Sequence, residues 1–164
     1  MLRSEISSDV EVLSELSMSF PWIPDKETIR PSDEILLYKT QTLNDICEKW
    51  NSIEDYILFR IFGKAFSIEN GRYVVKDFSV DRNKKVFRTN DFPYNIPVGN
   101  HWVMWYASKD RDFDSHQITH DISHSILQLL GHNNYDFAWY VNPKMTVPEF
   151  FHVQVFWIEH QNFR

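Results

Sequence analysis

The chain has 164 residues, of which 43% are hydrophobic, including 13 Phe, 7 Tyr and 6 Trp, so it has the length of one domain and enough bulky apolar side chains for a core. This composition excludes a disordered chain, and the formal net charge of −6 gives no general attraction for nucleic acid or anionic lipid, so we expect no nucleic-acid partner. The four glycines are too dispersed to form the glycine-rich phosphate loop of a Rossmann or P-loop protein.

The chain begins with a segment whose apolar pattern is thin. Residues 1–20 mix serines and acidic residues with a few apolar positions, so a helix would form there only if another surface received it. We therefore expect 1–30 to be a partly extended N-terminal arm and 31–164 to be a single α+β domain.

Two helices are predicted at the start of the domain. Beyond Ser32, apolar residues recur with near-helical spacing as far as Trp50. Ser52 and Asp55 then have the spacing of a capping box, which is typical of a helix N-terminus. Further apolar residues follow, and Gly63 is expected to end this second helix.

A β-hairpin is predicted immediately afterwards. Segments 65–69 and 72–76 have the residue types of strands, and Asn70-Gly71 between them tolerates the positive φ angles of a type I′ turn. The following stretch, 81–97, is charged and then rich in proline and asparagine, so we predict a long loop there.

The C-terminal half is predicted to complete an antiparallel sheet. Strands are expected at 101–107, 136–141 and 151–159, which are rich in aromatic and β-branched residues. A helix is expected at 115–130, before Gly131. With the hairpin this gives a five-stranded sheet with one helix packed on it, in the α+β class. The first and last of these three strands are predicted to be internal, because an edge position would expose their two apolar faces.

The last strand carries the most suggestive polar pair. Successive side chains of a strand alternate between faces, so His152 and Gln154 should share a face with Phe150 and Phe156. An imidazole in this position can attack phosphorus while a neighbouring amide donates to the phosphate oxygens. The same spacing also fits a histidine and a glutamine on the solvated face of an edge strand, and the residues alone leave both interpretations open.

Two segments carry a family resemblance. Residues 97–105 are Pro-Val-Gly-Asn-His-Trp-Val-Met-Trp, and Asn142 is followed at 147–155 by Val-Pro-Glu-Phe-Phe-His-Val-Gln-Val. They resemble two strands of the histidine-triad (HIT) superfamily. The ending in Gln is similar to the galactose-1-phosphate uridylyltransferase branch, whose nucleophile is the histidine two residues before the Gln. The resemblance therefore implies a HIT-like fold with His152 as nucleophile and Gln154 beside it.

Four further motifs occur in one order along the chain. They are Asn-Asp-Phe-Pro-Tyr at 90–94, His-Trp-Val-Met-Trp at 101–105, Trp-Tyr-Val-Asn at 139–142 and Val-Pro-Glu-Phe-Phe-His-Val at 147–153. Over roughly residues 35–160 they are similar to an uncharacterised domain family that includes the fungal N-acetylglucosamine-induced proteins. This likeness implies a fold and a site location but no activity. Both families have a histidine where this chain has Phe150.

The resemblances imply one site in which His152 and Gln154 are the catalytic pair. The expected ligand-binding residues are His101, Asn142, Arg82, Lys84 and Asn90. Arg82 and Lys84 belong to a basic stretch of the predicted loop that would steady a phosphate, or else form an ordinary solvated turn. A covalent histidine intermediate needs neither metal nor cofactor, so we expect none.

Three histidines recur on the predicted helix 115–130. His116, His120 and His124 are spaced i, i+4 and i+8, which would let two neighbours hold a divalent cation. The isoleucines of this helix lie roughly opposite them, so the spacing also fits three imidazoles on the solvent face. We expect no metal there.

Two functional hypotheses follow. The first is a hydrolase or transferase that acts on a small phosphorylated ligand, such as a nucleotide or sugar phosphate. The second is a binding or assembly module that has kept the fold and lost the triad, in keeping with Phe150 and with an Asn-, Lys-, Ile- and Phe-rich composition typical of AT-rich genomes such as viral ones. One cysteine, Cys47, and the lack of a long apolar run predict a cytoplasmic protein with no membrane partner.

Overall fold

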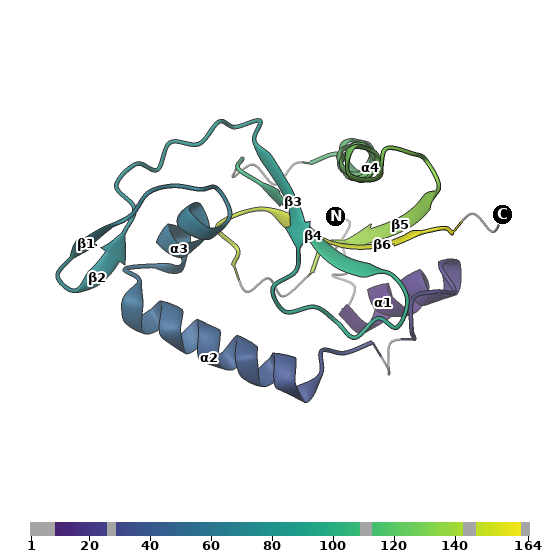
Figure 1. Cartoon of the computed structure of the whole chain (residues 1–164), viewed down its shortest axis with the longest axis horizontal. Coiled ribbons are helices and arrows are strands. Elements are labelled where there is room, and N and C mark those ends of the chain that lie inside the picture. Colours follow the sequence, from purple (N-terminus) through teal and green to yellow (C-terminus); the bar gives the residue numbers. More distant parts are fainter. Residues whose placement is uncertain (1–8, 26–28, 109–112, 143–146, 162–164) are drawn as a thin grey trace, which may run out of the picture.

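The structure is a computed structural model that describes residues 9–25, 29–108, 113–142 and 147–161. Its helices are α1 (Asp9–Ser19), α2 (Asp33–Lys49), α3 (Ile53–Arg60) and α4 (Ser115–Leu130), and its strands are β1 (Ser67–Glu69), β2 (Arg72–Val74), β3 (Lys85–Thr89), β4 (Asn100–Tyr106), β5 (Tyr135–Tyr140) and β6 (His152–Glu159) (Figure 1). The antiparallel order β3-β4-β6-β5 forms one sheet, and β1-β2 forms a separate hairpin. The predicted α+β class is confirmed. Within the described residues, no helix has the length and hydrophobicity needed to cross a membrane.

The main sheet differs from the predicted five strands in two ways. The hairpin is not part of it, because β1 and β2 have three residues each and pair with one another, although the predicted turn is confirmed by φ angles of 51° at Asn70 and 77° at Gly71. The segment predicted as a long loop contains β3, which pairs with β4.

The charged ends of β3 explain why the sequence pattern hid this strand. Lys85 extends to a buried carboxylate on α4, with its Nζ atom 2.6 Å from Oδ1 of Asp121, and Arg88 donates to the carbonyl of Arg60 at 3.0 Å. Both cations therefore have partners on neighbouring elements. At an edge of the sheet, long charged side chains can cover apolar surface while their charged groups stay outside it.

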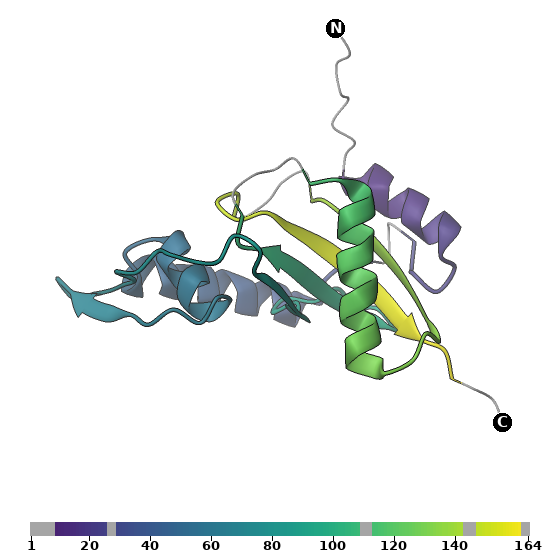
Figure 2. The ribbon, with the colours of Figure 1, turned by 90° about the horizontal axis from the view of Figure 1, so that it is seen from above.

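The internal strands were predicted correctly. β4 lies between β3 and β6, and β6 lies between β4 and β5. Helix α4 covers one face of the sheet, with α1 and α2 on the other side (Figures 1 and 2). On the α4 face, Ile118, Ile122 and Ile126 are buried in one cluster with Val153 and Val155 of β6. Apolar packing on both faces is what places β6 in the interior.

Helix α4 has the predicted bounds. Its first turn is capped by the side chain of Asp114, which accepts from the backbone N–H of His116 at 2.9 Å, and the helix ends at Gly131. His116, His120 and His124 are exposed, on the side away from the buried isoleucines, as the spacing predicted.

The N-terminal segment is more closely packed than predicted. Leu13, Ile23 and Ile29 are buried in a cluster with Tyr140 of β5 and Phe156 of β6. The described residues of 1–30 therefore include a helix that is received by another surface, the condition that the sequence set for a helix there. The sheet supplies the receiving surface that a short, weakly apolar helix requires.

A buried carboxylate fixes helix α3. Ser52 caps this helix as predicted, and the Asp55 carboxylate accepts from the Ser52 hydroxyl and, at 2.7 Å, from the backbone N–H of Val75 beyond the hairpin. Asp55 is only 1% exposed. This contact ties the start of α3 to the segment after β2 and so sets the position of Arg60 in its last turn.

Candidate functional site

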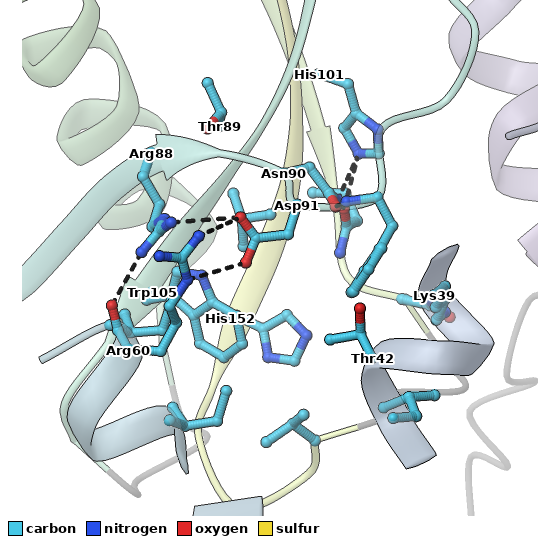
Figure 3. Close-up of a pocket in the computed structure, with 18 of the residues that line it drawn as sticks. Lys39, Thr42, Arg60, Arg88, Thr89, Asn90, Asp91, His101, Trp105 and His152 are labelled. Carbon is cyan, nitrogen blue, oxygen red and sulfur yellow. Dashed lines mark hydrogen bonds and ion pairs between the residues drawn. The ribbon is translucent and has the colours of Figure 1, made fainter. Parts of the chain in front are cut away.

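A cavity of about 170 Å³ lies between helices α2 and α3 and the sheet face opposite α4 (Figure 3). Of the residues predicted for the site, it is lined by His101, Asn142, His152, Gln154 and Asn90. The remaining two, Arg82 and Lys84, are not lining residues. Arg82 is exposed, and the Lys84 Nζ donates to the carbonyl of Phe62 at 3.2 Å.

The alternation of side chains along β6 places His152 and Gln154 on the face that lines the cavity. In β6, His152 and Gln154 face the cavity, while Val153 between them is buried in the cluster beneath α4. Register places Gln154 opposite Val103 of β4, and His152 opposite Trp105. The predicted sharing of one face by the polar pair is therefore confirmed.

The His101 imidazole serves as a fixed donor. Its Nδ1 accepts from the backbone N–H of Tyr94 at 3.0 Å, so the proton is on Nε2, which donates to Oε1 of Gln154 at 2.7 Å. Burial lowers the pKa of His101 to about 4, although the Gln154 bond opposes that shift. His101 is thus neutral at pH 7 with both ring nitrogens engaged, and its role is to position Gln154.

The amide of Gln154 is held in one orientation. Its Oε1 accepts from His101 and also, at 2.9 Å, from Nδ2 of Asn90, whose own Oδ1 accepts from the backbone N–H of Phe92 at 2.8 Å. Two donors on one oxygen identify that atom as the carbonyl end. The Gln154 NH₂ group makes no hydrogen bond with the described residues and is left to donate to a ligand.

His152, unlike His101, has a ring nitrogen that is available as a hydrogen-bond acceptor. Its Nδ1 lies 2.9 Å from the Phe150 carbonyl oxygen, which can only accept, so Nδ1 carries the proton and Nε2 holds a lone pair. This Nε2 has no hydrogen-bond partner among the described residues. Burial lowers the pKa of His152, against the opposing effect of the Phe150 carbonyl. The ring is therefore neutral at pH 7, and its Nε2 lone pair is chemically able to act as a nucleophile or a base.

Phe150, where the two families that the sequence resembles have a histidine, lies outside the cavity lining. It precedes β6 and is 2% exposed, and its ring centroid is 5.3 Å from that of Phe62. The Phe150 side chain thus belongs to the core, and only its backbone carbonyl contacts a residue of the site, His152.

The cavity also contains two arginines that sequence reasoning did not assign to the site. Arg60 and Arg88 both pair with Asp91, and both guanidinium groups point toward its carboxylate (Figure 3). Arg88 belongs to the same basic stretch as Arg82 and Lys84, and the face on which it lies depends on strand β3, which the sequence pattern did not predict. Nothing local links Arg60 to Asp91, because the pairing depends on the tertiary fold.

The rest of the lining combines an apolar wall with another cation. The wall consists of side chains of α2 and α3, among them Ile35, Leu43, Ile46, Ile53 and Tyr56. Lys39 of α2 also lines the cavity and lies over the ring of Phe92, 5.9 Å from its centroid. Three basic residues against Asp91 make the cavity cationic in a chain of net charge −6. Among the described residues, no group of three or more potential metal ligands occurs.

Comparison with known proteins gives no family assignment. No family model matches the chain, and no curated protein matches it. The chain is similar to a solved structure described as "Crystal Structure of HTC1", with a TM-score of 0.47 and 18% identity over 94% of this chain and 85% of that one.

Proposed function

We propose that the cavity binds a small phosphorylated ligand, such as a nucleotide or a sugar phosphate, and that His152 attacks its phosphorus. The observation that carries this proposal is the pairing of a neutral His152, whose Nε2 lone pair has no partner among the described residues, with an available Gln154 NH₂ group on the same face of one strand. A nucleophile beside a donor for the developing negative charge is the minimum that phosphoryl transfer requires.

The reaction divides into two displacements. The Nε2 lone pair forms a bond to phosphorus as the bond from phosphorus to the leaving oxygen breaks, and the electron pair of that bond stays with the leaving group, which takes a proton from solvent. The imidazolium charge is stabilised because Nδ1–H remains bonded to the Phe150 carbonyl. Water, or a second acceptor hydroxyl, then attacks phosphorus, loses its proton, and returns the lone pair to Nε2.

The proposal agrees with the HIT-like resemblance, in which the corresponding histidine is the nucleophile. One observation favours the second candidate, a module that binds the same ligand without turnover. Phe150 replaces a histidine and is buried beside Phe62, so the strand supplies no further imidazole to the reacting group.

Turnover of three probes separates the candidates: a nucleoside phosphoramidate, a sugar nucleotide and a dinucleoside polyphosphate. We expect His152→Ala to abolish turnover of any probe that the wild type cleaves, whereas His124→Ala, on the exposed face of α4, should have no effect. Mass spectrometry after an alkaline quench should show a phosphorus adduct on His152, because phosphohistidine is lost in acid. Turnover that survives His152→Ala contradicts the role of this residue, and binding without turnover or adduct establishes the binding module.

A further inference from the structure

Arg60, Arg88 and Asp91 form a charged cluster inside the cavity. The Asp91 carboxylate accepts from Nε and NH2 of Arg60 at 3.5 and 3.2 Å, and from NH2 of Arg88 at 3.3 Å. Charge-assisted hydrogen bonds between arginine and a carboxylate are ordinarily about 2.7–2.9 Å. Asp91 therefore occupies the Nε and NH2 donors with which Arg60 would bind an oxyanion. Its N–O distances are longer than those that a bound anion with ideal geometry would have.

We propose that Asp91 is an internal competitor for the anion site of this cavity: its carboxylate occupies Arg60 and Arg88 until a phosphate group of the ligand displaces it. This inference rests on the proposed function only in taking the ligand to be phosphorylated. It does not depend on attack by His152.

The contacts of the cluster allow the exchange. Asp91 forms its side-chain hydrogen bonds only with these two arginines among the described residues, so nothing else holds its carboxylate in the cavity. Arg88 has a second anchor, since its NH1 donates to the Arg60 carbonyl at 3.0 Å. Arg88 thus stays on the end of α3 when Asp91 leaves. A side chain 31% exposed can turn outward into water without a large desolvation cost.

The competition gives the site a preference for doubly charged groups. A ligand carboxylate would form the same kind of bonds with the two arginines as the Asp91 carboxylate does. Replacing Asp91 by such a group would therefore gain little binding free energy. A phosphate monoester carries up to two charges and three oxygens, and arginine binds such a group with two parallel bonds. We therefore infer that the cavity selects phosphate groups over carboxylates of similar size.

Calorimetric titration with inorganic phosphate tests the inference. We expect Asp91→Asn to bind phosphate about tenfold more tightly than the wild type, since it removes one negative charge at nearly constant shape. Glu69→Gln is the matched control: Glu69, on the hairpin, pairs with Lys76 outside the cavity lining, and its substitution changes the net charge equally. Phosphate affinity that is equal or weaker in Asp91→Asn overturns the proposal and makes Asp91 a positioning residue. Absence of phosphate binding by both proteins also overturns it.

A measurement on the wild type guards against a misfolded variant. The ¹³C signal of the Asp91 carboxylate and the Nε–H signal of Arg60 should shift together on addition of phosphate and remain unmoved by equimolar acetate. An Asp91 signal that does not respond to bound phosphate overturns the displacement. The two proposals also fail separately: a chain that shows the Asp91 effect but neither turnover nor a His152 adduct retains this inference and loses the proposed reaction.

Discussion

The imidazole of His152 lies flat against the indole of Trp105, with ring centroids 4.3 Å apart and planes inclined by 25°. The two residues are directly opposite in the β4–β6 register. The indole covers one face of the imidazole while Nδ1 is bonded to Phe150, so the ring has little freedom and Nε2 is held in one direction. For the attack proposed for His152, such a fixed orientation would be an advantage, because a reacting group is most effective when it is oriented before the ligand arrives.

Replacing Trp105 should release this ring. We expect Trp105→Leu to lower the free energy of unfolding by about 2 kcal/mol or more, because a large buried side chain is lost. It should also raise the pKa of His152, since burial is the main cause of the present lowering. Urea denaturation and NMR titration of the imidazole measure the two effects. In Trp105→Phe the pKa should stay closer to that of the wild type, and an unchanged pKa in Trp105→Leu would argue against the role of the indole.

His101 should make the protein sensitive to acid. Its pKa is about 4 when folded and near 6.5 when unfolded, so between these values only the unfolded chain binds the proton. Stability is therefore complete above pH 6.5 and falls as the pH drops toward 4, by up to about 3 kcal/mol. His101→Gln should be less stable at pH 7 but show a shallower fall across this window in urea denaturation. His116→Gln, on an exposed position, should keep the wild-type slope. A His101→Gln slope as steep as that of the wild type would contradict this assignment.

Gly99 is predicted to tolerate no side chain. Its φ is 97°, and a Cβ atom there would lie 3.0 Å from the Trp157 carbonyl oxygen and 3.2 Å from the Trp22 ring. We expect Gly99→Ala to lower the thermal midpoint substantially, at a cost of about 2 kcal/mol or more. Gly131→Ala is the control, because φ there is 76° but a Cβ atom would meet open space. Equal losses in the two variants would show that the contacts at Gly99 are unimportant.

A histidine at position 150, where the resembling families have one, should not complete a triad. Phe150→His places an imidazole in a buried apolar position beside Phe62, which we expect to cost about 2–4 kcal/mol of unfolding free energy. Phosphate affinity should change little, because Phe150 does not line the cavity. Phe78→His, at an exposed phenylalanine, controls for the chemical change. A gain of turnover in Phe150→His would refute this reading of the position.

Local signals in the sequence were sufficient for much of the fold. The Ser52 cap, the Asn70-Gly71 turn and the helix end at Gly131 depend on a few neighbouring residues, so their patterns can be recognised without tertiary information. Strand alternation was likewise enough to place His152 and Gln154 on one face. The packing of the N-terminal segment could not be predicted, because it depends on a sheet surface formed by residues more than 100 positions away, such as Tyr140.

The cationic part of the site needed the tertiary structure. Arg82 and Lys84 were predicted as site residues because they belong to a basic stretch. Strand β3 begins directly after Lys84, and it is Arg88 of this strand that lines the cavity, whereas Arg82 and Lys84 do not. Arg60 lies 31 residues from Asp91 on a different element. No spacing rule connects such a pair before the helix and the sheet are assembled.

The central position of β6 has a consequence for how the site loses structure. The strand that carries His152 and Gln154 is hydrogen-bonded on both edges and packed beneath α4 through Val153 and Val155. We therefore expect its backbone amides to exchange with deuterium only when the whole molecule unfolds. Arg60, in contrast, sits in the last turn of an eight-residue helix, where fraying is local. The two halves of the cavity thus belong to regions of unequal protection, and heat or denaturant should loosen the cationic half while the histidine half is still intact.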